Sequence, residues 1–159
     1  MRFFLIDRVT AFVPGVSARG VKAVSLSDEI LHDHFPDFPV MPGALIVESV
    51  AQLAGFLLEM SFNDVGDPDP QRALLTMIKD AKFYEAAGPG DRLDLSVTIG
   101  PTLEGAAQVK GEVRVGEKRI ARVGLTFMLK RVGSARVHEQ RRYIYKLWTA
   151  GLELPRPLP

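Results

Sequence analysis

The hydrophobic and polar positions of this 159-residue chain follow two different periods. Apolar residues alternate with polar ones in the second half of the chain, which is the pattern of half-exposed β-strands. These alternating segments are 93–99, 107–115 and 121–129. Shorter runs rich in β-branched or aromatic residues indicate further strands at 8–13, 20–26 and 72–84. We therefore expect five or six antiparallel strands in a sheet with one buried and one solvent-exposed face.

The stretch from Pro42 to about Met60 predicts a long helix of a different character. Its apolar residues leave almost no polar face, and a helix that is apolar all round is a buried one. Proline is well placed in the first turn of a helix, where its missing N–H costs nothing. One buried helix and several antiparallel strands predict an α+β layout in which the sheet wraps around the helix.

Residues 137–150 predict a second, amphipathic helix. Four apolar side chains there recur at spacings of three and four residues and so share one face. They are Tyr143, Ile144, Leu147 and Trp148. A helix this short is marginal in water, so we expect it to form by docking that face on the body of the protein. His138 is expected to be solvated, and the proline-rich residues 154–159 to be extended.

Composition narrows the classes of function. The formal net charge is +1, so no strong field draws the protein to nucleic acid or to a membrane. The chain has no cysteine, which excludes disulfides, thiolate chemistry and zinc sites built on cysteine. The apolar run at residues 3–6 is too short for a signal peptide or a membrane span. We expect a cytoplasmic protein.

One carboxylate in the apolar helix is a candidate catalytic group. Glu48 lies among aliphatic residues, where a carboxylate is rarely buried without a partner or a role. Gln52 follows four residues later and so lies on the same helix face. A histidine, His34, and a proline-stiffened loop lead into the helix, which begins at Pro42 and Gly43.

These groups suit the removal of water from a 3-hydroxyacyl thioester. A neutral imidazole, here His34, is a natural base for the proton next to the carbonyl. A carboxylic acid in an apolar setting can stay protonated and donate to the departing hydroxyl, a role for Glu48. The free N–H groups of a helix N-terminus suit the carbonyl oxygen, and Gly43 has no side chain to block its approach. Singly, each residue also has a purely structural explanation, and only their joint occurrence favours chemistry.

The segment that holds these residues resembles a known family. His34-Phe-Pro-x-x-Pro-Val-Met-Pro-Gly43, followed by Leu45-Ile-Val-Glu48-Ser-Val-Ala-Gln52, is similar to the active-site segment of the beta-hydroxyacyl-acyl carrier protein dehydratases of the FabZ type, related to FabA. The resemblance covers roughly residues 3–131. It also includes Leu5-Ile-Asp-Arg-Val9, Ile78-Lys-Asp-Ala-Lys-Phe83 and Gly88-Pro-Gly-Asp91.

The resemblance implies a hot-dog fold and a dimer whose active sites each take the histidine from one subunit and the glutamate from the other. His34 and Glu48 then take the catalytic roles. The residues expected to bind or support the substrate are Gly43, Gln52, Phe35 and Pro42. Glutamate at position 48, rather than aspartate, favours a plain dehydratase over the FabA type, which also isomerises the double bond.

The implied partner is an acyl carrier protein that presents the acyl chain on a phosphopantetheine arm, in fatty acid or related lipid or polyene synthesis. The implied assembly is a homodimer or a trimer of dimers, with no metal and no cofactor. Two alternatives stay open: a hot-dog thioesterase, in which Glu48 activates water, and a non-catalytic protein that binds acyl thioesters. Neither of them requires the His34 motif.

The sequence departs from the family pattern at two kinds of place. Asp33 and Asp37 stand where glycines are common in the family. Residues 132–159 match nothing in the common enzymes, so we divide the chain into a hot-dog dehydratase domain at 1–131 and a C-terminal extension at 132–159. The extension carries a second helix whose basic residues either face solvent or meet an acidic carrier protein. These residues are Arg141, Arg142 and Lys146.

Overall fold

A computed structural model describes residues 3–103 and 105–159. In this part of the chain there are six strands, two α-helices and one 3-10 turn. In chain order they are β1 (Arg8–Val13), β2 (Ser17–Ala23), η1 (Glu29–Leu31), α1 (Gly43–Phe62), β3 (Gln71–Phe83), β4 (Arg92–Leu103), β5 (Ala106–Val115), β6 (Lys118–Arg131) and α2 (Ala135–Trp148).

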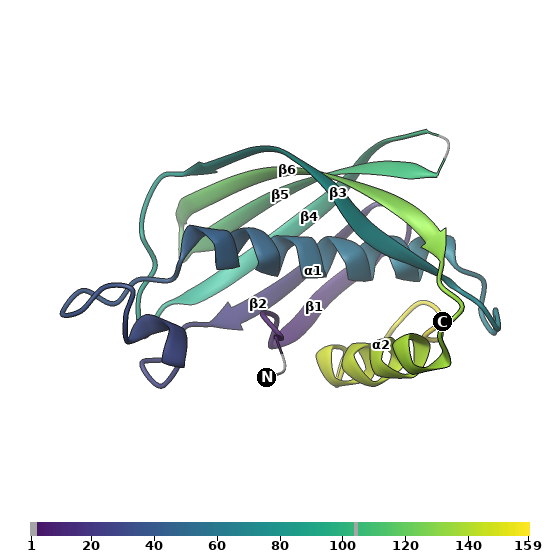
Figure 1. Cartoon of the computed structure of the whole chain (residues 1–159), viewed down its shortest axis with the longest axis horizontal. Helices are drawn as coiled ribbons and strands as arrows, with labels where there is room; N and C mark the ends of the chain where they lie inside the picture. Colours follow the sequence, from purple (N-terminus) through teal and green to yellow (C-terminus); the bar gives the residue numbers. More distant parts are fainter. Residues whose placement is uncertain (1–2, 104) are drawn as a thin grey trace.

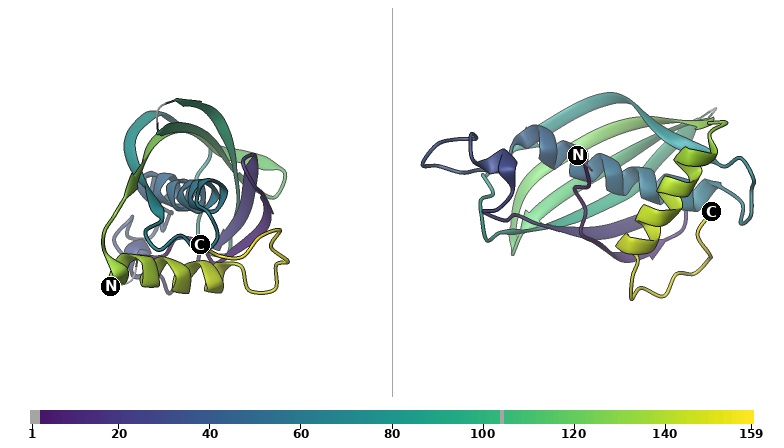
Figure 2. Two further views of the ribbon diagram at one scale, coloured as in Figure 1. Left: turned by 90° about the vertical axis from the view of Figure 1, so that its right-hand side faces the viewer. Right: turned by 60° about the horizontal axis from the view of Figure 1, so that its bottom comes forward.

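The six strands form one antiparallel sheet in the order β1-β2-β4-β5-β6-β3. The sheet curves around α1, and α2 lies on the side of α1 that the sheet leaves open (Figure 1, Figure 2). The expected α+β layout, with a sheet wrapped around a long helix and a second helix near the C-terminus, is therefore confirmed. β1 and β3 are the two edges of the sheet.

The apolar character of α1 is explained by its position. Val50, Leu53 and Phe56 are fully buried against the concave face of the sheet. The helix is long and apolar enough to span a membrane by composition alone, but 67% of the relevant window is buried inside the protein. At Gly111 of β5, an added Cβ would lie 2.2 Å from the Val50 side chain, so this glycine lets the helix approach the sheet closely.

The second strand begins earlier than the sequence pattern indicates. We expected it at 20–26, but β2 spans Ser17–Ala23 because Ser17 already pairs with Val13 directly after the turn. Gly15 in that turn has a φ of +71°, a left-handed conformation that glycine adopts readily. The other strands and the first helix lie within a few residues of their predicted bounds.

The second helix docks on the body of the protein, as expected, but through a different face. Ile144 and Trp148 are buried as predicted, whereas Tyr143 and Leu147 are about half exposed, and Tyr145 is buried in their place. The Tyr145 ring meets Phe56 of α1 edge-on, with centroids 5.1 Å apart. The buried stripe is centred on this tyrosine because its hydroxyl has a polar partner inside the core.

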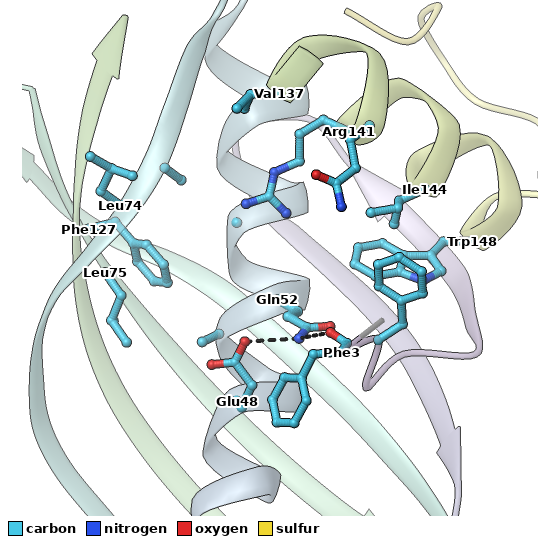
Figure 3. A pocket seen from close by; sticks show the side chains of 15 residues that line it. Phe3, Glu48, Gln52, Leu74, Leu75, Phe127, Val137, Arg141, Ile144 and Trp148 are labelled. Carbon is cyan, nitrogen blue, oxygen red and sulfur yellow. Dashed lines mark hydrogen bonds between the residues drawn. The ribbon is translucent and has the colours of Figure 1, made fainter. Parts of the chain in front are cut away.

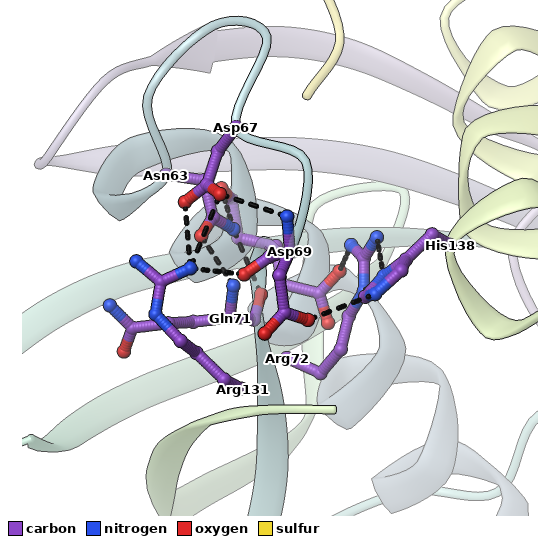
Figure 4. Close-up of polar contacts among 8 residues, drawn as sticks. Asn63, Asp67, Asp69, Gln71, Arg72, Arg131 and His138 are labelled. Carbon is purple, nitrogen blue, oxygen red and sulfur yellow. Dashed lines mark hydrogen bonds and ion pairs between the residues drawn. The ribbon is translucent and has the colours of Figure 1, made fainter. Parts of the chain in front are cut away.

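That partner belongs to a buried polar network that joins α2 to α1 and β3. The Tyr145 hydroxyl and Arg72 Nη1 each donate to Glu59 Oε2 at 2.7 Å. Arg72 Nη2 also lies 2.8 Å from His138 Nδ1, and His138 Nε2 lies 3.3 Å from Asp69 Oδ1 (Figure 4). Arg72 only donates, so Nδ1 accepts, and the ring proton lies on Nε2 toward Asp69. Burial, and then the Glu59 charge, raise the pKa of Tyr145 well above its ordinary value, which keeps its hydroxyl a donor.

The network corrects the expectation for His138. We predicted a solvated side chain in a basic stretch, but His138 is 8% exposed. Its partner Arg72 lies 66 residues away in the sequence, so the local pattern held no sign of the contact. A buried arginine and glutamate remain tolerable because each satisfies the other.

The loop between α1 and β3 is held by a separate set of contacts (Figure 4). Asn63 donates to the carbonyls of Glu59 and Gln71 and accepts from the Gln71 N–H at 2.7 Å. Arg131 donates to Asp67, and the Asp69 backbone N–H donates to the same carboxylate. The Asp69 N–H, and then Arg131, lower the pKa of Asp67. These contacts fix the entry into β3, which carries Arg72.

Candidate active site

Glu48 and Gln52 form a hydrogen-bonded pair on one face of α1. Gln52 Nε2 donates to Glu48 Oε1 at 2.9 Å and to the Phe3 carbonyl at 3.0 Å (Figure 3). The Leu5 N–H donates in turn to Gln52 Oε1 at 3.0 Å. Every atom of the Gln52 amide group is therefore engaged, and the amide orients the carboxylate of Glu48. Glu48 is itself only half-buried, so a ligand can reach it.

His34 is oriented by the loop that precedes α1. Its Nδ1 lies 3.0 Å from the Val40 carbonyl oxygen. A carbonyl can only accept, so we assign the ring proton to Nδ1, which leaves Nε2 as an acceptor. The ring stacks on Phe35 with centroids 4.4 Å apart. A neutral imidazole in this tautomer can take a proton from a substrate through Nε2.

The loop conformation explains why glycine is common in the family at position 37, where this chain has Asp37. Asp37 has a φ of +63°, in the left-handed region that favours glycine. Asp37 lies in a tight turn in which Phe35 and Phe38 exchange backbone hydrogen bonds of 2.9 Å. Aspartate is one of the few side chains that tolerate this conformation. Asp33 is exposed, and its φ is not in that region.

Gly43 is the first residue of α1, and Pro42 caps it without a side-chain hydrogen bond. In the first turn the Leu45 N–H already donates to the Pro42 carbonyl at 2.9 Å, whereas no hydrogen bond of the Gly43 N–H occurs among the described residues. The Gly43 N–H therefore remains available to a ligand. A Cβ at Gly43 would lie 2.9 Å from the ring of Phe83, the last residue of β3, so the absence of a side chain at Gly43 lets this ring pack closely. Pro42 is half-buried, and Phe35 is 55% exposed.

A cavity of about 700 Å³ opens beside Glu48, between α1, β3 and α2. Most of its lining residues are apolar, and its polar lining residues are Glu48, Gln52, Gln140 and Arg141. Such a mixture of apolar walls with a few polar groups is usual for ligand sites. The lining residues include Glu48, Gln52, Gly55, Leu74, Leu75, Phe127, Arg141, Ile144 and Trp148. Glu48 and Gln52 thus meet in one cavity, while His34, Phe35, Pro42 and Gly43 of the same chain do not line it.

Sequence reasoning missed two charged residues near this cavity. Glu59 is 0% exposed and follows Glu48 by eleven residues, which is about three helical turns at 3.6 residues per turn. That spacing was a usable signal of a second carboxylate on the same side of α1. Arg141 was expected to face solvent or an acidic carrier protein, but it reaches the cavity from α2 (Figure 3). Its position depended on the orientation of α2, which the local pattern misjudged.

The arrangement of the sheet around one long helix defines the class of fold. A hot-dog-like protein from Thermanaerovibrio acidaminovorans has a similar structure, with a TM-score of 0.62, 20% sequence identity, and coverage of 84% of this chain and 92% of the other. The hot-dog fold implied by the family resemblance is therefore confirmed.

The sequence places the chain in a family within that fold. Residues 1–124 match the model of the FabA-like domain. A 3-hydroxyacyl-[acyl-carrier-protein] dehydratase FabZ from Thermoanaerobacter sp. is 34% identical over 131 residues, which cover 82% of this chain and 89% of the relative. A FabZ of the same name from Levilactobacillus brevis is 40% identical over 124 residues, covering 78% and 81%. The chain belongs to the FabA-like family, and the resemblance to its FabZ branch is confirmed.

Proposed function

We propose that this protein dehydrates 3-hydroxyacyl thioesters carried on an acyl carrier protein, giving trans-2-enoyl thioesters. The observation that carries the proposal is Glu48, held by Gln52 in the wall of a cavity lined mostly by apolar side chains, in a chain of this family. An apolar cavity suits an acyl chain, and the carboxyl group suits proton transfer at the end of it.

In the proposed reaction, three groups act on one substrate. His34 Nε2 takes the proton from the carbon next to the thioester carbonyl, and the electron pair of that C–H bond becomes the new C=C bond. The C–O bond of the 3-hydroxyl breaks, and the protonated Glu48 donates its proton so that water leaves. The Gly43 N–H at the start of α1 stabilises the negative charge that builds up on the carbonyl oxygen. Phe35 and Pro42, which lie in the same loop as His34 and at its end, are proposed to contact the substrate.

We further propose a homodimer in which His34 of one subunit completes the site of Glu48 in the other. His34 does not line the cavity of its own chain's Glu48, which supports this arrangement. The edge strand β3 also exposes large apolar side chains, as surfaces that meet a partner protein often do, and the first two of them line that cavity. They are Leu74, Leu75, Met77, Ile78 and Phe83. The phosphopantetheine arm then enters at the junction of two subunits, and the cytoplasmic location stays a prediction.

The test is to incubate the protein with a 3-hydroxyacyl thioester and, separately, with the enoyl thioester. Dehydratase activity interconverts the two by loss or gain of water, which mass spectrometry and the absorbance of the conjugated enoyl group both record. Release of free thiol would instead indicate a thioesterase. Tight binding with neither product would indicate a non-catalytic acyl-binding protein.

A further inference from the structure

The cavity beside Glu48 continues along α1 toward the C-terminal helix. Gly55 lies on this wall, seven residues beyond Glu48, which is about 10 Å along the helix axis at about 1.5 Å per residue. A Cβ at Gly55 would meet no atom within 4 Å, so packing within this chain does not require a glycine there. Glycine in a helix interior costs about 0.5–1 kcal/mol relative to alanine. Its effect here is to leave the cavity wide.

The far part of the cavity is walled by α2 together with the start of β3. Val137, Ile144 and Trp148 supply apolar contacts there. Arg141 extends from α2 across the face of α1, and Glu48 and Gln52 lie further along the same helix (Figure 3). The cavity thus has the Glu48 carboxyl group, held by the Gln52 amide, at one end and the Arg141 guanidinium at the other (Figure 3). Most of the other side chains in its wall are apolar, and Gln140 is the further polar one.

The Arg141 guanidinium has hydrogen-bonding capacity to spare. Among the described residues its one polar contact is an approach of Nε to Glu59 Oε1 at 3.9 Å, too long for a hydrogen bond. Glu59 is already satisfied by Arg72, Tyr145 and the Ala73 N–H, at 2.7, 2.7 and 3.1 Å. The Arg72 charge balances that of Glu59, so the positive charge of Arg141 stays largely uncompensated. Its side chain is 38% exposed, enough to be reached and still partly shielded from water.

We propose that Arg141 forms a subsite for a negatively charged group at the end of the acyl chain, with a terminal carboxylate as its ligand. This inference rests on the proposed dehydratase function. A guanidinium presents its donors in a planar fork that matches a carboxylate in a bidentate pair. The apolar walls between Glu48 and Arg141 would hold the methylene groups of the chain. The subsite would favour such a chain over the same chain with a terminal methyl group, which leaves the guanidinium desolvated and unpaired.

The experiment compares matched pairs of 3-hydroxyacyl-pantetheine thioesters, from hexanoyl to dodecanoyl, in which the terminal group is either methyl or carboxylate. kcat/KM is measured for the wild type, for Arg141→Gln, and for Arg142→Gln as a control. Arg142 is the exposed neighbour on the same helix and does not line the cavity. Melting temperatures establish that each variant is folded.

We expect the wild type to prefer the carboxylate-ended chain of the best-fitting length by about tenfold or more, the usual scale of a charge-assisted hydrogen bond. Arg141→Gln should abolish this preference, and Arg142→Gln should retain it. Equal or better turnover of the methyl-ended chains by the wild type would overturn the proposal. So would an equal loss of preference in both variants, since that indicates a diffuse field and not a subsite.

A binding measurement separates this inference from the proposed function. The saturated, unreactive acyl-pantetheines with either terminal group are titrated into the same three proteins by calorimetry. If no thioester is dehydrated, the proposed function fails, but tighter binding of the carboxylate-ended analogue that depends on Arg141 still supports the subsite. Binding that is indifferent to the terminal group, or to Arg141, would overturn the subsite even if dehydration is observed.

Discussion

At the scale of single residues, the candidate chemistry depends on how two side chains are held. The Val40 carbonyl sets the tautomer of His34 so that Nε2 is free to act as a base. Gln52 ties Glu48 to the N-terminal segment through three hydrogen bonds. Groups that are held in this way need little reorganisation when a substrate binds.

We predict that His34→Ala and Glu48→Gln each lower the dehydration turnover at least about a hundredfold, which is the usual scale for a positioned base or acid. His32→Ala is the matched control, because His32 is an exposed histidine two residues before His34. It should keep near-native turnover. Steady-state kinetics on the best substrate measure all three, with circular dichroism to establish folding. Near-native turnover in either active-site variant would show that its role is misassigned.

The motif around Glu48 allowed the candidate site to be predicted from the sequence. The residues that surround the motif in the fold could not be predicted in this way. His34, Glu48 and Gln52 lie within nineteen consecutive positions and match a long family motif. Arg141 and Tyr145 come from α2, far along the chain, and Arg72 comes from β3, beyond the loop that follows α1. Their assembly depends on tertiary packing that no local period records.

At the scale of elements, the long helix and the alternating strands were predictable because their patterns are strong and repeated. The helix α1 is apolar on most of its surface because the sheet and α2 cover it, and the strands alternate because one face of the sheet is buried. The orientation of α2 was not predictable in the same way. Tyr143 and Tyr145 are both aromatic, so the local pattern does not distinguish them. Tyr145 is the one that is buried, and its hydroxyl donates to the buried carboxylate of Glu59.

We predict that the buried face of α2 contributes directly to stability. Trp148 is 4% exposed and Leu147 is 51% exposed, so adjacent positions on one helix provide a matched comparison. Trp148→Ala should lower the free energy of unfolding by about 3–5 kcal/mol, the usual cost of truncating a buried aromatic side chain. Leu147→Ala should change it by at most about 0.5 kcal/mol, as is usual for surface substitutions. Urea denaturation measures both. Equal effects would mean that α2 does not dock through this face.

At the scale of the whole molecule, the proposed site is divided between two regions of the single chain. Glu48 opens into a cavity that lacks the His34 of the same chain, and the neighbouring edge strand β3 exposes apolar side chains. Both features are accounted for if two copies pair so that each supplies the histidine to the other's glutamate. α2 then closes the far part of a cavity whose near part lies at the subunit boundary.

The most direct test of this account is subunit complementation. Inactive His34→Ala and inactive Glu48→Gln proteins are mixed, subunit exchange is verified by mass spectrometry, and dehydration of the best 3-hydroxyacyl thioester is measured. In a mixed dimer with shared sites, one of the two sites holds both native groups. We therefore predict that activity returns, up to about half of the wild-type turnover for each mixed dimer, as is expected of independent sites. No recovery after complete exchange would contradict the shared dehydratase site.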